Sequence, residues 1–187
     1  PSPEDEVPTL IRNPKWIQPI KTIFDMINIL PGYREKDIGG VFLIFFSVFS
    51  AMLIGDAGYG AFFLLIAMVS RKVFSKAPQA PFFLFGILSV CTMVWGVLTG
   101  NYFGVSNIPA PLKALRVEWL NNEKNIMHFC FFIGSIHLTV AHAWNAISMM
   151  NSTRVVAQIG WICMTWTMYI TARTMILDAT FPAWGYY

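Results

Sequence analysis

The chain has 187 residues, of which 56% are hydrophobic, 16% aromatic and only 12% charged, and its formal net charge is +3. Soluble domains have about 25% charged residues, so this composition argues against a water-soluble globule, as does the mean hydropathy of +0.55. The high hydrophobicity excludes a disordered chain, and three widely spaced cysteines argue against a disulfide-rich secreted domain. The small net charge, without a basic face, disfavours nucleic acid as a partner. What remains is a membrane protein or a piece of one.

The N-terminal part, residues 1–37, differs from the rest and is predicted to be a cytoplasmic juxtamembrane segment. Its first residues are acidic and rich in proline, which indicates an extended strip. Over residues 15–30, apolar side chains recur with helical spacing and predict an amphipathic helix. The predicted apolar face consists of Trp16, Ile20, Ile23, Ile27 and Leu30. We expect this helix to lie on the membrane surface or to pack against a soluble partner.

Long gaps between charged residues predict membrane-spanning helices in residues 38–187. A helix needs about 20 mostly apolar residues to cross a bilayer, and three uncharged stretches are long enough for one helix each. These helices are predicted near residues 82–104, 125–147 and 155–176. The predicted fold class is therefore all-α, a polytopic transmembrane helical bundle preceded by an amphipathic juxtamembrane helix.

The stretch from residue 38 to residue 70 is ambiguous, because it is too long for one untilted helix and short for two. Its single charge, Asp56, lies among three glycines in the segment Gly55-Asp56-Ala57-Gly58-Tyr59-Gly60. Since glycine suits a tight turn, we predict two short helices, near 38–54 and 57–71, hinged at this segment. The alternative is one long tilted helix. The distribution of basic residues does not separate the two topologies, and both place the N-terminus inside.

Two polar residues of the predicted membrane domain, Asp56 and His137, are the candidate site residues. Asp56 is expected either at membrane depth or at the tip of the helical hairpin. Asp56 is expected to cap the N-terminus of the helix that follows it, and the alternative is a carboxylate in an ion pathway or gate. His137 lies in the middle of its predicted helix. It is expected to make a polar contact between helices, and the alternative is a proton relay.

Several glycines are predicted to mark close helix packing. Gly96, Gly100 and Gly104 are spaced by four residues, which predicts one helix face that a neighbour can approach closely. The predicted packing glycines are Gly55, Gly58, Gly60, Gly96, Gly100, Gly104 and Gly134. Neither the histidines nor the cysteines have the spacing of metal ligands, and no phosphate-binding loop is present. The sequence therefore predicts no catalytic, cofactor-binding or metal-binding residue.

Five stretches, in the same order, resemble motifs of one family. They are Pro8–Trp16, Tyr33–Asp37, Met52–Gly60, Trp95–Gly104 and Gly134–Leu138. The family is the membrane domain of the V-type rotary ATPase stator subunit, which is called subunit a in eukaryotes and subunit I in prokaryotes. Tyr59 and the variable motif positions are more similar to the prokaryotic branch.

The resemblance implies a non-catalytic, multi-pass stator subunit of a prokaryotic cell membrane, with its N-terminus in the cytoplasm and lipid around it. The family carries H⁺, or Na⁺ in some members, beside a proteolipid rotor ring. It contacts peripheral and central stalk subunits through an N-terminal arm that this chain lacks. No residue of the chain matches the family's transport arginine, which lies in later helices, so these helices are expected to brace the channel. The resemblance also favours the hinged pair of helices over one long helix.

Two rival functions stay open. The first is an unrelated secondary transporter with a broken-helix site at Asp56, which predicts an internal inverted repeat. The second is an intramembrane enzyme, which requires Asp56 and His137 within hydrogen-bonding reach of each other. An Asp56 that caps a helix would argue against both.

Overall fold

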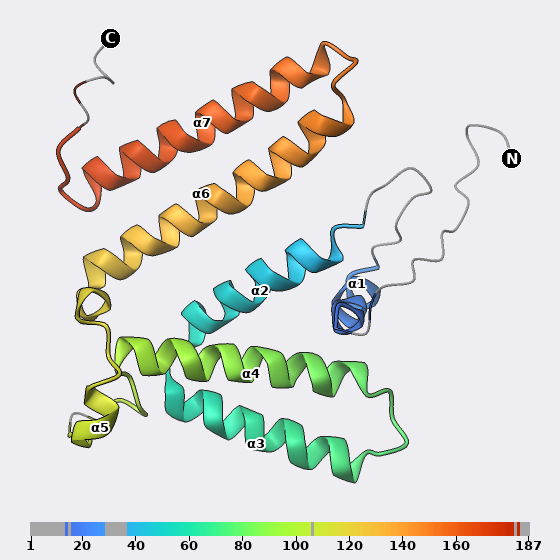
Figure 1. Ribbon diagram of the computed structural model, residues 1–187, viewed down its shortest axis with the longest axis vertical. Coiled ribbons are helices and arrows are strands. Elements are labelled where there is room, and N and C mark those ends of the chain that lie inside the picture. The colour runs from blue at the N-terminus through green and yellow to red at the C-terminus, as the bar shows by residue number, and fades with distance from the viewer. Residues whose placement is uncertain (1–13, 15, 29–36, 106, 182, 184–187) are drawn as a thin grey trace, which may run out of the picture. The chain divides into compact units, whose positions relative to one another are not determined.

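We analysed a computed structural model of the chain, in which residues 14, 16–28, 37–105, 107–181 and 183 are described. The chain forms two compact units, Pro1–Val117 and Glu118–Tyr187, and each is described by itself. Every regular element in the described residues is a helix, which confirms the all-α prediction (Figure 1). The first unit contains η1 (Gln18–Ile20), α1 (Lys21–Met26), α2 (Gly39–Ile54), α3 (Ala57–Val73), α4 (Ala80–Thr99) and α5 (Ala110–Lys113). The second unit contains η2 (Glu118–Asn121), α6 (Glu123–Ser148) and α7 (Arg154–Met175).

Helices α4, α6 and α7 are long and apolar enough to cross a membrane. Helices α2 and α3 have 16 and 17 residues. At about 1.5 Å per residue they are roughly 24–26 Å long, which is short of the ~30 Å hydrocarbon core of a bilayer. Large apolar side chains point outward on all these helices, as Leu53 does with 88% of its surface exposed. Outward-facing apolar side chains on long helices are what a lipid environment requires.

Helix α4 is the centre of the first unit, because both α2 and α3 pack against it. Figure 1 shows α3 and α4 running antiparallel, with α2 on another side of α4. The side chains buried between these helices are mostly small: Ser47, Ala51, Ala57, Ala67, Ser89 and Thr92. Small residues let helix backbones approach closely where lipid supplies no hydrophobic drive for association. The hydroxyls of Ser89 and Thr92 donate to carbonyls one turn earlier, so that both groups are satisfied in the interface.

The juxtamembrane segment packs against α2 and α4 through η1 and its flanking residues. Ile20 is fully buried and forms a cluster with Ile17, Leu43 and Leu84. The buried face therefore includes Ile17, which the predicted face omits, whereas Trp16 stays 56% exposed. The helix ends at Met26, earlier than predicted, and Lys15 and Leu30 lie outside the described residues. The buried face of this segment therefore differs from the predicted face, because the residues around Ile20 pack against α2 and α4.

The second unit is an antiparallel pair of helices, α6 and α7, joined by a short turn (Figure 1). The Trp166 indole of α7 donates to the hydroxyl of Thr139 of α6 at 3.0 Å, and this hydrogen bond links the two helices. At one end, Lys124 forms an ion pair with Asp178, which follows α7. The hydrogen bond and the charge of Lys124 lower the pKa of Asp178 below its ordinary value.

Candidate functional site

Asp56 lies between α2 and α3 and caps the first turn of α3. Its Oδ1 accepts hydrogen bonds from the backbone N–H groups of Gly58, at 2.7 Å, and Tyr59, at 3.0 Å. The residue has extended backbone angles, φ −139° and ψ 125°, as an N-cap requires. It is only 4% exposed, and it lies at the helix N-terminus, where backbone N–H groups lack partners within the helix. This is the capping geometry expected from the sequence.

Gly55 ends α2 and turns the chain into α3. Its φ is +66°, a left-handed conformation that glycine adopts without steric cost. Its N–H donates to the carbonyl of Ala51 at 2.9 Å, which closes the last turn of α2. The stretch from residue 39 to residue 73 is therefore two helices with a break at Asp56, and one continuous helix is excluded.

Asn101, just beyond α4, joins the ends of three helices. Its backbone N–H donates to the carbonyl of Gly96 in α4 at 2.8 Å, and its own carbonyl accepts from the N–H of Ala57 at 2.9 Å. Its side-chain amide donates to the carbonyl of Gly55, at the end of α2, at 3.2 Å. We call Gly55, Asp56, Ala57, Gly96 and Asn101 the Asn101 junction. Together with Asp56, Asn101 satisfies backbone groups that helix ends otherwise leave without partners.

No role for Asn101 was predicted from the sequence. The residue is 46 positions from Gly55, and no local pattern predicts a contact over that distance. One feature of the sequence could have indicated this role, namely that the amide side chain directly follows Gly100 at the end of an apolar helix.

Gly60 and Gly96 bring α3 and α4 into backbone contact. A β-carbon added at Gly96 would lie 1.9 Å from the backbone N of Ala57, and one at Gly60 would lie 2.4 Å from the backbone N of Met93. No side chain fits at either position without moving a helix. Both glycines are therefore close-packing positions in the structure, one at the Asn101 junction and the other one turn into α3.

Gly58 makes room for an aromatic ring. A β-carbon there would lie 2.3 Å from the ring of Phe103, whose centroid is 5.2 Å from that of Tyr59. Phe103 has a φ of +52°, which is unusual for a bulky residue. The loop after α4 thus folds back over the first turn of α3.

The predicted helical stripe through Gly96, Gly100 and Gly104 is wrong, because α4 ends at Thr99. Gly100 has a φ of +74° and donates its N–H to Val97, while Asn101 donates to Gly96. This pair of bonds is a Schellman motif, which ends a helix at a left-handed glycine. Gly104 also lies outside the helix, and a β-carbon there would contact nothing within 4 Å. Gly134 lies in α6 and has the same open surroundings, so close packing is not seen at it within the described residues.

His137 lies half-buried in α6, in the second unit. The other two histidines of this helix contact α7: His128 Nε2 lies 2.6 Å from the hydroxyl of Tyr169, and His142 Nδ1 lies 2.8 Å from Oε1 of Gln158. From their spacing in the sequence, His128 and His142 were considered only as metal ligands, and these contacts were not predicted. Within the described residues, no three His, Cys, Asp or Glu side chains are grouped to hold a metal ion.

No family model matches the chain. Over 191 aligned residues the chain is 38% identical to V-type ATP synthase subunit I 1 of Treponema pallidum, covering 95% of this chain and 30% of that protein. It is 32% identical over 198 residues to V-type ATP synthase subunit I of Borreliella burgdorferi, covering 99% of this chain and 33% of that protein. The chain is homologous to subunit I of the V-type and A-type ATP synthases.

The A-type side of this family is represented by subunit I of Archaeoglobus fulgidus, which is 26% identical over 121 residues, 64% of this chain and 18% of that protein. These matches confirm the family resemblance found in the sequence and its prokaryotic character. The chain spans about a third of the length of its bacterial subunit I relatives. With its three apolar helices of membrane-spanning length, this subunit I homologue is an integral membrane protein.

Proposed function

We propose that the chain is part of the stationary membrane domain of a rotary ATP synthase, beside the ring of proteolipid subunits that carries H⁺ or Na⁺. The observation that carries this proposal is the 38% identity to a subunit I over 95% of the chain. In this proposal the complex lies in a prokaryotic cell membrane with the N-terminus of the chain in the cytoplasm. In this proposal the chain contributes no catalytic residue to the complex and binds no cofactor.

The role proposed for this segment is to brace the helices that conduct ions. The first unit supports such a role, because α3 and α4 are in backbone contact at Gly60 and Gly96. Asn101 ties the same two helices to the end of α2. A rigid group of helices can hold neighbouring channel helices against a moving ring. Asp56 belongs to this brace as a structural carboxylate, and His137 is proposed to be a polar contact near the channel.

Purification of the native protein from its own membranes in mild detergent tests the proposal. We expect the intact bait to be far heavier than 21.1 kDa and to arrive with a proteolipid ring, stalk subunits and nucleotide-binding subunits in mass spectrometry. The protein carries an affinity tag for this purification. An unrelated multi-pass protein with the same tag, purified in parallel, controls for non-specific carry-over. A bait of about this mass that arrives alone would contradict the stator proposal and would favour a secondary transporter.

A further inference from the structure

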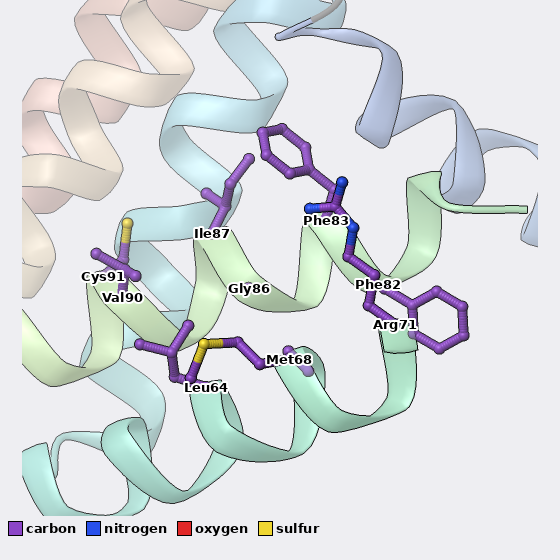
Figure 2. Close-up of a pocket in the computed structure, with 10 residues that line it drawn as sticks. Leu64, Met68, Arg71, Phe82, Phe83, Gly86, Ile87, Val90 and Cys91 are labelled. Carbon is purple, nitrogen blue, oxygen red and sulfur yellow. The ribbon is translucent and has the colours of Figure 1, made fainter. Parts of the chain in front are cut away.

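A groove of about 380 Å³ lies between α3 and α4, on the side away from the Asn101 junction. Its lining is almost entirely apolar and comes from Leu64, Ala67 and Met68 of α3 and from Gly86, Ile87 and Val90 of α4. Figure 2 shows Leu64, Met68, Ile87 and Val90 around the groove, with Arg71 at the end of α3 extending toward α4. Among the described residues that line the groove, Arg71 is the one that carries a charge.

Two of the residues that line the groove have little or no side chain. Ala67 has a single methyl group, and a β-carbon added at Gly86 would meet nothing within 4 Å. In the same pair of helices, Gly60 and Gly96 lie in tight backbone contact. Glycines therefore have two different effects between α3 and α4. Gly60 and Gly96 allow close contact, whereas Gly86 leaves open space.

The groove opens outward on a helix of membrane-spanning length. Met68 and Phe83 on its rim are 51% and 45% exposed, and α4 has the length and hydropathy of a span. From Leu64 to Arg71 the groove follows seven residues of helix, or about 10 Å. An apolar slot of that length beside a membrane helix suits part of an acyl chain.

The charge at the end of the groove is positive and is not neutralised by the surrounding sequence. Arg71 and Lys72 lie in the last turn of α3, and Lys76 follows in the exposed loop before α4. Residues 57–117 contain no Asp or Glu. Basic side chains beside a pocket between membrane helices complement anionic lipid headgroups.

We propose that this groove binds an anionic phospholipid, with its phosphate beside Arg71 and one acyl chain along Gly86. Charge and shape together identify the occupant: a cationic side chain lies at the end of the groove where α3 ends, and an apolar slot leads from it along α4. The site does not depend on the function proposed above, since its residues lie outside the Asn101 junction.

The test uses the complete native protein, purified and reconstituted in phosphatidylcholine vesicles. The vesicles contain a trace of phosphatidylglycerol that carries a photoactivatable diazirine on one acyl chain. After illumination, mass spectrometry locates and quantifies the label. We expect label in residues 64–91, and several-fold less from a phosphatidylcholine probe with the same diazirine.

Paired variants separate the charge from the slot. Arg71→Gln should reduce labelling by phosphatidylglycerol about fivefold, the factor typical of one basic residue at an anionic lipid surface, and Arg71→Lys should retain most of it. Gly86→Leu should fill the slot and remove the label from it. The matched controls are Arg154→Gln, at the exposed start of α7, and Gly160→Leu, at a glycine with equally open surroundings; both should leave labelling of residues 64–91 unchanged.

Three results would overturn the proposal. One is equal labelling by the two lipids, and another is unchanged labelling in Arg71→Gln. The third is label elsewhere in the protein but none in residues 64–91, which would mean that a protein helix covers the groove. If Gly86→Leu does not assemble, the comparison of Arg71→Gln with Arg71→Lys decides by itself. Arg71 is exposed, and both replacements keep a long polar side chain there.

Discussion

Asp56 shows how a buried carboxylate between two apolar helices can be explained by local chemistry. Its Oδ1 accepts from two N–H groups that a helix start would otherwise leave without partners. A carboxylate held in this way is engaged in structure, and using it to bind a passing proton would weaken the cap. An asparagine can make the same bonds without the charge, so the two roles of Asp56 are separable by experiment.

We expect Asp56→Ala to destabilise the protein by about 1 kcal/mol, the usual cost of losing an N-cap. Asp56→Asn should keep most of that stability, because asparagine caps helices about as well as aspartate. Unfolding of the detergent-solubilised protein by heat measures the stability of both variants, and ion-coupled ATP synthesis by the complex measures function. An Asp56→Asn protein that is stable but cannot couple ions would assign Asp56 to an ion pathway instead.

At the scale of elements, the packing of α3 on α4 depends on two glycines and on the way α4 ends. Gly60 and Gly96 leave no space for a side chain, whereas Gly100 ends α4 in a left-handed conformation. These are different physical requirements, close approach at the first two and backbone angle at the third. Equal spacing of glycines in a sequence does not distinguish them.

Gly96→Ala should destabilise the first unit by about 1–3 kcal/mol, the usual cost of overpacking. The added β-carbon would lie 1.9 Å from a backbone nitrogen, which cannot move without separating α3 from α4. Thermal unfolding in detergent measures the effect. Gly160→Ala, on an open face of α7, is the matched control and should lose no stability, because alanine is the better helix former. Equal behaviour of the two variants would show that α3 and α4 are not in close contact at Gly96.

At the scale of the whole chain, the three helices of membrane-spanning length determine which loops share a side of the membrane. Since α4 begins after residues 74–79 and α6 ends before residues 149–153, these two loops should lie on one side. The loop of residues 100–122 should lie on the other. This alternation holds whether or not the shorter helices α2 and α3 each cross the bilayer.

Single cysteines introduced at Ser75, Leu115 and Asn151 test this topology, in a protein whose own cysteines are replaced. A membrane-impermeant maleimide applied to intact cells, and then to inverted vesicles, should label Ser75→Cys and Asn151→Cys from the same side. Leu115→Cys should react from the opposite side only. Labelling of all three positions from one side would mean that α4 or α6 does not span the membrane.

The sequence by itself determined the features that depend on local chemistry. An uncharged run of about 20 residues in lipid forms a helix because every backbone group must be satisfied internally, so composition predicted the all-α class. Asp56 among glycines predicted a helix break with an N-cap, because the partners of its carboxylate are two and three residues away. The family resemblance was also visible in the sequence, since it depends on short motifs.

Only the tertiary structure decided the features that depend on distant residues. Asn101 joins the ends of three helices through hydrogen bonds. Only α4, which it follows directly, is close to it in the sequence. The buried face of the juxtamembrane helix was set by the position of Ile20 against α2 and α4. Gly86 and Gly96 are both glycines of α4, but one borders an open groove and the other a helix backbone. Residue type and spacing do not distinguish Gly86 from Gly96, because the difference is whether atoms of the neighbouring helix lie next to the glycine.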